Sequence, residues 1–152
     1  MLFRSRVFVV PNAVDMRFLA PIVSPEVART ALGLQSGFWI GTVTSVNEHE
    51  GLETAVDAAA ILRSRGLDAR MLVVGEGPAL AALRLRAESA GVPLVTPGRV
   101  PFADVREYYD ALDVFVLPRK DTRLGRRVTA LKPLEAQARG VPVVGSEDRK
   151  ST

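Results

Sequence analysis

The chain of 152 residues has no cysteine, a single histidine, His49, and no long run of apolar residues. Without cysteine there is no disulfide bridge and no thiolate nucleophile, and one imidazole is too few for a histidine-rich metal site. The first ten residues, MLFRSRVFVV, are too weakly apolar for a secretory signal and fall far short of the ~20 residues that span a bilayer. We expect no metal, no cofactor, no transmembrane segment, and a cytoplasmic location, either free or peripheral to the inner face of the membrane.

Hydrophobic residues make up 47% of the chain and charged residues 24%, which is an ordinary composition for a globular domain. A chain of this length buries roughly two-thirds of its unfolded surface, so a hydrophobic core can hold it together without disulfides or structural zinc. It is too short for two full domains. We therefore expect one compact domain.

The positive charge is concentrated in one segment. Residues 119–139 contain seven Lys and Arg against two acidic residues, whereas the rest of the chain has thirteen basic residues against fifteen acidic ones. The net charge of +3 therefore originates in this segment. A local surplus favours a bound anion over a uniformly basic nucleic-acid surface, and the segment lacks aromatic side chains on which bases stack. We expect no nucleic-acid partner.

Short apolar runs alternate with helical patterns from Phe38 almost to the end of the chain. Runs such as MLVV, VFVL and VPVV are uninterrupted, which is typical of strands covered by helices on both faces. Trp39 and Phe115 lie in such runs and are expected in the core. The pattern predicts strands at residues 38–43, 70–74, 93–96, 114–117 and 142–144.

Helical patterns fill the gaps between these strands. Apolar residues recur at helical spacing over residues 52–62, and further helices are predicted at 78–91 and from residue 101, where Tyr108 and Tyr109 lie on a face expected to pack. Strict alternation with short connections predicts an α/β fold: a doubly wound parallel sheet of about five strands with helices on both faces.

The first 36 residues depart from this alternation. A strand-like VFVV is followed by PNAVDMRFLAP and by a short helix predicted near residues 25–32. We interpret residues 1–36 as a lead-in strand, linker and short helix that pack against the sheet. Residues 37–146 form the domain itself, and the polar residues 147–152 are expected to be a disordered tail.

Ligands of an open α/β sheet bind outside the carboxyl ends of its strands. The loop after the first strand carries Ser45 and His49, and GEGP and PGRVP follow the second and third strands. Gly75 and Gly77 permit the close approach of either a ligand or the neighbouring loop, and the sequence leaves both open. His49 is expected to be an exposed loop residue rather than a catalytic base.

The segment RKDTRLGRRVTALKPLEAQA is the most informative part of the sequence. Thr129 can cap a helix that contains Lys132 and Glu135, with Pro133 in its first turn, so that free N–H groups and the Lys132 ammonium face the cleft. This combination suits a diphosphate. Glu135, one turn further, can accept hydrogen bonds from a vicinal diol such as a ribose; the alternative is a solvated helix residue beside an exposed basic loop.

Four segments of the chain match the pattern of a known enzyme family. They are VVPNAVDMRFLAP, MLVVGEGPALAALRLRAESAGV, TPGRVPFADVREYYDALDVFVLP and LKPLEAQARGVPVVGS. In this order and spacing they resemble the C-terminal, donor-binding domain of the retaining GT-B glycosyltransferases of group 1, also called family 4. The resemblance implies a Rossmann-like domain that binds a nucleoside-diphosphate sugar for hexosyl transfer, in polysaccharide or glycoconjugate biosynthesis and without a metal.

These observations together predict a donor site of ten residues. They are Ser45, Gly75, Gly77, Arg99, Val100, Arg119, Arg127, Thr129, Lys132 and Glu135. The resemblance implies that Glu135 contacts the ribose and that main-chain groups of residues 99–100 face the base. Lys132, helped by Arg119 or Arg127, is expected at the diphosphate.

Three positions depart from the family pattern. An Arg and a Lys that hold the diphosphate in the family correspond here to Ser45 and Glu50, and a Glu that contacts the donor sugar corresponds to Arg127. The sugar-contact role therefore does not carry over, and no catalytic base is assigned.

The N-terminal acceptor domain of the family and the elements expected after Ser146 have no counterpart, so the chain resembles a donor-binding half cut at both ends. Two functions stay open. The chain is either the donor-binding part of a transferase that works with a separate acceptor-domain protein, or a non-catalytic remnant or nucleotide-binding module.

Overall fold

The structure, a computed structural model, describes residues 11–120 and 131–146. Its sheet consists of β1 (Phe38–Val43), β2 (Ala69–Val74), β3 (Leu94–Gly98), β4 (Val114–Leu117) and β5 (Val143–Gly145). The helices are the short 3-10 helices η2 (Met16–Leu19) and η3 (Glu48–Glu50) and the α-helices α1 (Pro25–Ala31), α2 (Leu52–Ser64), α3 (Leu80–Ser89), α4 (Val105–Asp110) and α5 (Lys132–Ala138).

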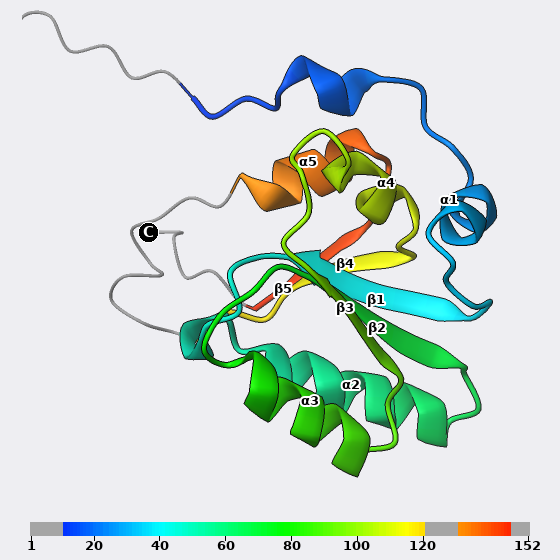
Figure 1. The fold of residues 1–152 in the computed structure, drawn as a ribbon, viewed down its shortest axis with the longest axis vertical. Helices are drawn as coiled ribbons and strands as arrows, with labels where there is room; N and C mark the ends of the chain where they lie inside the picture. The colour runs from blue at the N-terminus through cyan, green and yellow to red at the C-terminus, as the bar shows by residue number, and fades with distance from the viewer. Residues whose placement is uncertain (1–10, 121–130, 147–152) are drawn as a thin grey trace, which may run out of the picture.

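All five strands are parallel, in the order β3-β2-β1-β4-β5. The chain winds outward from β1 through β2 to β3, and the other half of the sheet is formed by β4 and β5 (Figure 1). This confirms the α/β fold with about five parallel strands that the alternation of apolar runs and helical patterns predicts.

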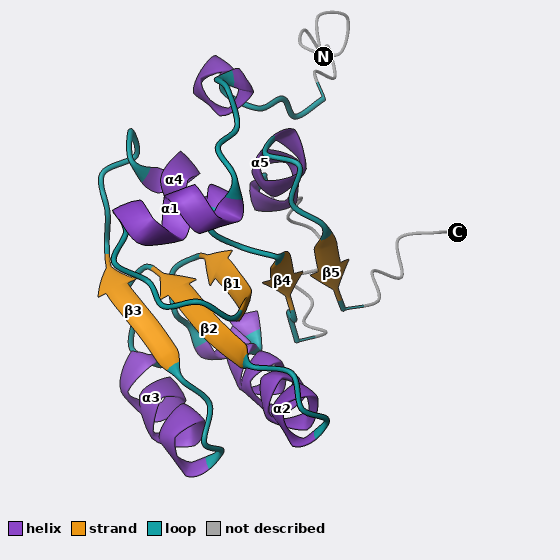
Figure 2. Cartoon of the chain, turned by 90° about the vertical axis from the view of Figure 1, so that its right-hand side faces the viewer, coloured by secondary structure: helices purple, strands orange, loops and turns teal. Residues whose placement is uncertain are grey.

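Helices cover both faces of the sheet, as Figures 1 and 2 show: α2 and α3 lie on one side and α1, α4 and α5 on the other. Side chains of β2 alternate between the two layers, because successive strand residues point to opposite faces. Met71 and Val73 join the core beneath α2 and α3, and Leu72 joins Trp39 and Phe115 in the other core. Trp39 and Phe115 are almost fully buried, as predicted.

Most predicted boundaries agree with the structure within one or two residues. The strand expected to end at residue 96 continues to Gly98, because β3 is an edge strand, where Pro97 is tolerated, and Gly98 pairs with Val74 after a shift in register. Two helices begin later than predicted, at Leu80 rather than residue 78 and at Val105 rather than residue 101, because turns precede them.

Residues 11–36, the described part of the lead-in, pack against the side of the sheet that carries α4 and α5. Phe18 of η2 is buried in the same core as Trp39. Arg29 of α1 donates hydrogen bonds to the Ala111 carbonyl at 2.8 Å and the Asp113 carboxylate at 2.6 Å. The strand-like VFVV and the expected tail at 147–152 lie outside the described residues, and the domain boundaries stay a prediction.

Candidate functional site

The order of the strands places a switch point between β1 and β4, because the connections from these two strands run to opposite sides of the sheet. The loops after β1 and β4 lie next to each other here: the Lys120 N–H donates to the His49 carbonyl at 3.0 Å. A Cβ at Gly51 would collide with the Pro118 carbonyl, so glycine is required where the two loops touch. Open α/β sheets bind their ligands in a crevice outside the strand ends at such a point, so the crevice expected here lies beyond these two loops.

Lys132 reaches this crevice from the start of α5. Its Nζ donates a hydrogen bond to Thr44 Oγ1 at 3.0 Å, at the carboxyl end of β1. Thr44 is almost fully buried and Lys132 is half-buried. Burial lowers the pKa of the Lys132 ammonium below its ordinary value, Glu50 and Glu135 act to raise it, and Arg119 acts to lower it. The ammonium is thus partly desolvated, hydrogen-bonded to Thr44 and placed at the switch point.

Glu50 lies beside Lys132 and pairs with Arg119. The Arg119 Nε and Nη2 atoms are 3.4 and 3.5 Å from the two Glu50 oxygens, and Glu50 is only 5% exposed. His49 Nε2 lies 3.4 Å from Glu50 Oε1, while the His49 side chain is about half exposed, as expected for a loop residue. Arg119 is therefore partly neutralised by Glu50, whereas Lys132 forms no ion pair with the part of the chain that the structure describes.

Glu135, one turn into α5, is held by Tyr109 of α4. The Tyr109 hydroxyl donates to Glu135 Oε2 at 2.7 Å, and the tyrosine is fully buried. Burial raises the pKa of the Tyr109 phenol, and the Glu135 carboxylate raises it further. The sequence predicts only packing for Tyr109, because nothing in the spacing of residues 109 and 135 reveals that the two helices bring them together.

Gly75 and Gly77 bring the loop after β2 against the loop after β1. A Cβ at Gly75 would collide with the Thr44 carbonyl, and one at Gly77 would collide with the Val46 carbonyl. The Val46 N–H also donates to the Glu76 carbonyl at 2.9 Å. Of the two alternatives left open by the sequence, close approach of the neighbouring loop is the one these contacts support. Both glycines thereby fix the backbone that carries Thr44.

The remaining predicted residues occupy different surroundings. Ser45 is exposed in the loop after β1, Arg99 is exposed after β3, and Val100 is half-buried against the core of Trp39 and Phe115. Arg127 and Thr129 lie outside the described residues. Leu131 occupies the cap position of α5 and makes no side-chain cap hydrogen bond.

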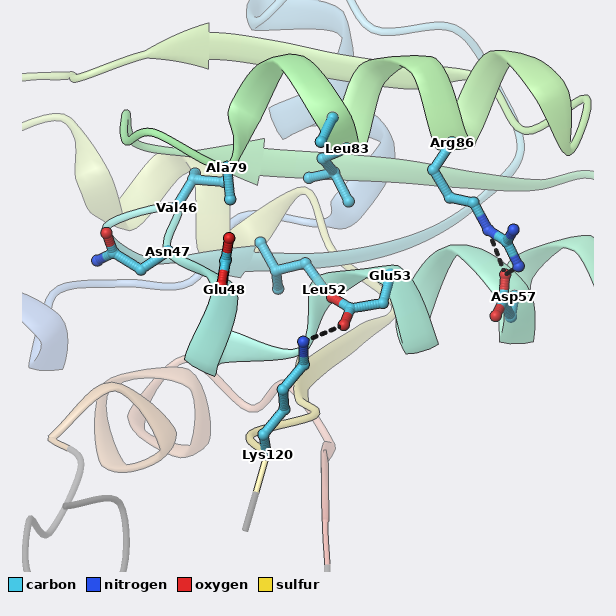
Figure 3. A pocket seen from close by; sticks show the side chains of 11 residues that line it. Val46, Asn47, Glu48, Leu52, Glu53, Asp57, Ala79, Leu83, Arg86 and Lys120 are labelled. Atoms are coloured by element: carbon cyan, nitrogen blue, oxygen red, sulfur yellow. Dashed lines mark hydrogen bonds and ion pairs between the residues drawn. The ribbon is translucent and has the colours of Figure 1, made fainter. Parts of the chain in front are cut away.

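A pocket of about 560 Å³ opens near the crevice, between α2, α3 and the loop after β1 (Figure 3). Its apolar side chains include Leu52 and Leu83, and its rim carries two ion pairs, Arg86 with Asp57 and Lys120 with Glu53, each at 2.6 Å. None of the ten predicted donor-site residues lines this pocket.

Residues 11–120 and 131–146 contain no group of three or more His, Cys, Asp or Glu side chains arranged to hold a metal ion. In the same ranges no helix has both the length and the apolar character needed to cross a membrane.

The parallel sheet with its switch point between β1 and β4 has the Rossmann-like architecture of a GT-B domain. A family model described as glycosyl transferases group 1 matches residues 37–150, and the chain belongs to this family. That range contains all ten residues of the predicted donor site.

Curated relatives and solved structures agree with this assignment. The chain is 34% identical over 140 residues to 2-deoxystreptamine glucosyltransferase of Streptomyces kanamyceticus, covering 89% of this chain and 35% of the relative. It is 31% identical over 149 residues to the lipopolysaccharide core biosynthesis mannosyltransferase LpsB of Rhizobium meliloti, covering 91% and 40%. The chain thus spans between a third and two-fifths of the length of these relatives.

Among solved structures, the C-terminal domain of the group 1 glycosyltransferase LpcC from Francisella tularensis superposes with a TM-score of 0.72 at 20% identity, covering 88% of this chain and 70% of that one. Anabaena HepE in complex with UDP and glucose superposes with a TM-score of 0.65 at 20% identity, covering 88% and 36%. At these identities the likeness shows the fold.

Proposed function

We propose that this chain is the donor-binding part of a retaining glycosyltransferase, which takes a glycosyl group from a nucleoside-diphosphate sugar in polysaccharide or glycoconjugate biosynthesis. The observation that carries the proposal is the half-buried Lys132 ammonium, held by Thr44 at the switch point of the sheet. A diphosphate bound there gains a charge-assisted hydrogen bond from a cation that is already desolvated.

The ionic surroundings favour the diphosphate near Lys132. Arg119 lies close enough to affect the pKa of Lys132, yet Glu50 pairs with its guanidinium. Lys132 therefore supplies most of the attraction, and Arg119 adds to it where it turns from Glu50 toward a bound phosphate. These groups are proposed to stabilise the leaving diphosphate electrostatically, in place of a bound metal ion.

Glu135 is proposed to accept hydrogen bonds from the ribose diol of the same ligand. It lies one helical turn from Lys132, and both carboxylate oxygens can accept. HepE, a neighbour by fold, has been crystallised with UDP and glucose, and both curated relatives carry names of sugar transferases. These names support a nucleotide-sugar donor for the present chain.

Transfer itself is proposed to need an N-terminal acceptor domain in addition to this donor half, in the same polypeptide or as a separate protein, since no residue here is assigned as a catalytic base. The donor half and the acceptor half together would enclose the sugar. Titration with nucleoside diphosphates identifies the nucleotide base. Assays of the donor and acceptor halves together identify the sugar and the acceptor.

The proposal is tested by calorimetric titration of the purified chain with UDP, GDP and ADP in the presence of EDTA, after circular dichroism has confirmed a folded sample. Binding of one of them with a dissociation constant between micromolar and millimolar is expected, and the preferred ligand identifies the base. A folded chain that binds none of the three contradicts the proposal and favours a remnant that has lost its donor site.

Replacing Glu135 by alanine is expected to remove discrimination between the preferred nucleoside diphosphate and its 2′,3′-dideoxy analogue. The wild-type chain should favour the ribose form by at least about tenfold, because a single hydrogen bond to a charged group contributes about 1.5–3 kcal/mol. Titration of both ligands against both proteins measures the effect. An unchanged ratio in Glu135→Ala would exclude the ribose role.

A further inference from the structure

We infer that Tyr109 is a positioning residue for Glu135: its buried hydroxyl holds the carboxylate in the orientation that accepts the ribose diol. This inference rests on the proposed function, because it assigns a partner to the residue proposed to bind the ribose. The observation behind it is the 2.7 Å hydrogen bond from the Tyr109 hydroxyl to Glu135 Oε2.

The donor side of this hydrogen bond is rigid. Tyr109 is fully buried, with its ring edge-on to Phe18 at 5.7 Å between centroids and tilted against Phe115 at 5.6 Å. Burial and aromatic packing on two sides restrict the ring, and so hold the hydroxyl at its position beside Glu135.

The two helices that carry the pair are also fixed relative to each other. Asp110, the next residue of α4, accepts two hydrogen bonds from Arg139, at 2.7 and 2.6 Å. Arg139 follows α5 directly and lies one turn beyond Glu135. The distance between the Tyr109 hydroxyl and the Glu135 backbone is therefore set by a buried ion pair independent of any ligand.

The chemistry of the pair suits a carboxylate that must also bind a ligand. A tyrosine with a raised pKa remains protonated and can only donate to the carboxylate, and a carboxylate accepts up to about four hydrogen bonds. Within residues 11–120 and 131–146 no second hydrogen bond reaches the Glu135 carboxylate, so Oε1 and the remaining lone pairs can accept from two vicinal hydroxyls. Without the phenol, the Glu135 side chain regains rotational freedom that the ligand must then remove.

The test is Tyr109→Phe, which keeps the ring and its packing and removes only the hydroxyl. Tyr108→Phe is the matched control, because Tyr108 is the neighbouring, half-buried tyrosine and its hydroxyl has no hydrogen-bond partner within the described residues. Each variant is titrated with the nucleoside diphosphate preferred among UDP, GDP and ADP and with its 2′,3′-dideoxy form.

Tyr109→Phe is expected to weaken binding of the ribose form by about threefold to tenfold, the effect of ordering one flexible side chain on binding. Binding of the dideoxy form should change by less than about twofold, and Tyr108→Phe should leave both unchanged. In the Glu135→Ala background, Tyr109→Phe should have no further effect on the ratio.

The outcomes separate this inference from the proposed function. If Glu135→Ala abolishes the discrimination and Tyr109→Phe leaves it intact, or weakens both ligands equally, the positioning role is wrong while the ribose site stands. If the diphosphates bind but Glu135→Ala changes nothing, the ribose role fails and the inference with it. If none of the diphosphates binds, the donor site itself is overturned.

Discussion

Replacing Lys132 by alanine is expected to weaken binding of the preferred nucleoside diphosphate by about 10- to 100-fold, while binding of the corresponding nucleoside changes by less than about twofold. A charge-assisted hydrogen bond to phosphate contributes about 1.5–3 kcal/mol, and each 1.4 kcal/mol corresponds to tenfold in affinity. The nucleoside lacks the phosphates and so does not report on the ammonium. Calorimetric titration of both ligands gives the two ratios.

Lys120→Ala is the matched control for this substitution. Lys120 is also a lysine near the switch point, but it is exposed and pairs with Glu53 at 2.6 Å, on the side of the pocket between α2 and α3. Its removal should alter diphosphate affinity by no more than a few-fold, because exposed charges are screened by solvent and salt. A comparable loss for nucleoside and diphosphate in Lys132→Ala would contradict the phosphate role.

The pH dependence of binding gives a second readout of Lys132. Because burial lowers its pKa, the ammonium loses its proton at a lower pH than an ordinary lysine near 10.5. Diphosphate affinity should therefore fall as pH rises toward this value, starting earlier than for an exposed lysine. In Lys132→Arg the guanidinium keeps its charge throughout this range, so the remaining affinity should be independent of pH. Parallel profiles for the two proteins would exclude Lys132 as the titrating group.

The strands of the sheet were predictable because each one is a short apolar run in the sequence. β1 and β4 have the predicted limits. Short, nearly continuous apolar runs such as FWIGTV and VFVL are typical of strands that helices cover on both faces. The limits of β3 were less predictable, because an edge strand continues through Pro97 without losing a ladder bond. Local sequence patterns thus predict that a strand is present more accurately than they predict the residues at which it begins and ends.

The candidate site was predictable only in part. The position of Lys132 at the switch point follows from strand order and from the basic segment around it. Its partner Thr44 lies 88 residues away in the sequence, and Tyr109 lies 26 residues from Glu135. These pairs depend on helix packing and on the contact of Gly75 with the Thr44 backbone, which no spacing in the sequence encodes.

Glu50, which stands where the family pattern has a basic residue, also shows that partners in the fold cannot be predicted from the sequence. From the sequence it is a loss of positive charge at the diphosphate. In the structure Glu50 is a buried carboxylate that Arg119 and His49 surround, so it also restrains a guanidinium that could otherwise contact the ligand. Whether a charge substitution weakens a site thus depends on the partners that the fold provides for the new residue.

The largest expected effect on stability is that of Arg139→Met, at about 3–5 kcal/mol of the free energy of unfolding. The side chains of Arg139 and Asp110 are only 1% and 3% exposed and lie 2.6 Å apart. Arg139 also donates to the Phe18 and Pro21 carbonyls at 3.1 Å each, and so joins α5, α4 and the lead-in. Methionine fills much of the volume but leaves the Asp110 carboxylate buried without its cation.

Urea denaturation followed by circular dichroism measures this loss, and Arg86→Met provides the control. Arg86 also donates from Nε and Nη2 to an aspartate, at 2.9 and 2.6 Å, although both bonds go to one oxygen of Asp57 and both side chains are about half exposed. Its removal should cost about 0–1 kcal/mol, because solvent replaces the lost partner. The contrast between the two variants compares a buried arginine that also binds backbone carbonyls with an exposed arginine that pairs with aspartate alone.

Adding Asp110→Asn to Arg139→Met should recover part of the stability, because the second substitution removes the uncompensated charge rather than a favourable contact. A double variant as unstable as the sum of the two single variants would instead mean that Arg139 acts mainly through the carbonyls of the lead-in. Since α4 and α5 also carry Tyr109 and Glu135, the same ion pair that stabilises the fold sets the geometry of the proposed ribose contact. Loss of discrimination between the ribose and dideoxy ligands should therefore accompany the loss of stability in Arg139→Met, even at temperatures where the variant is still folded.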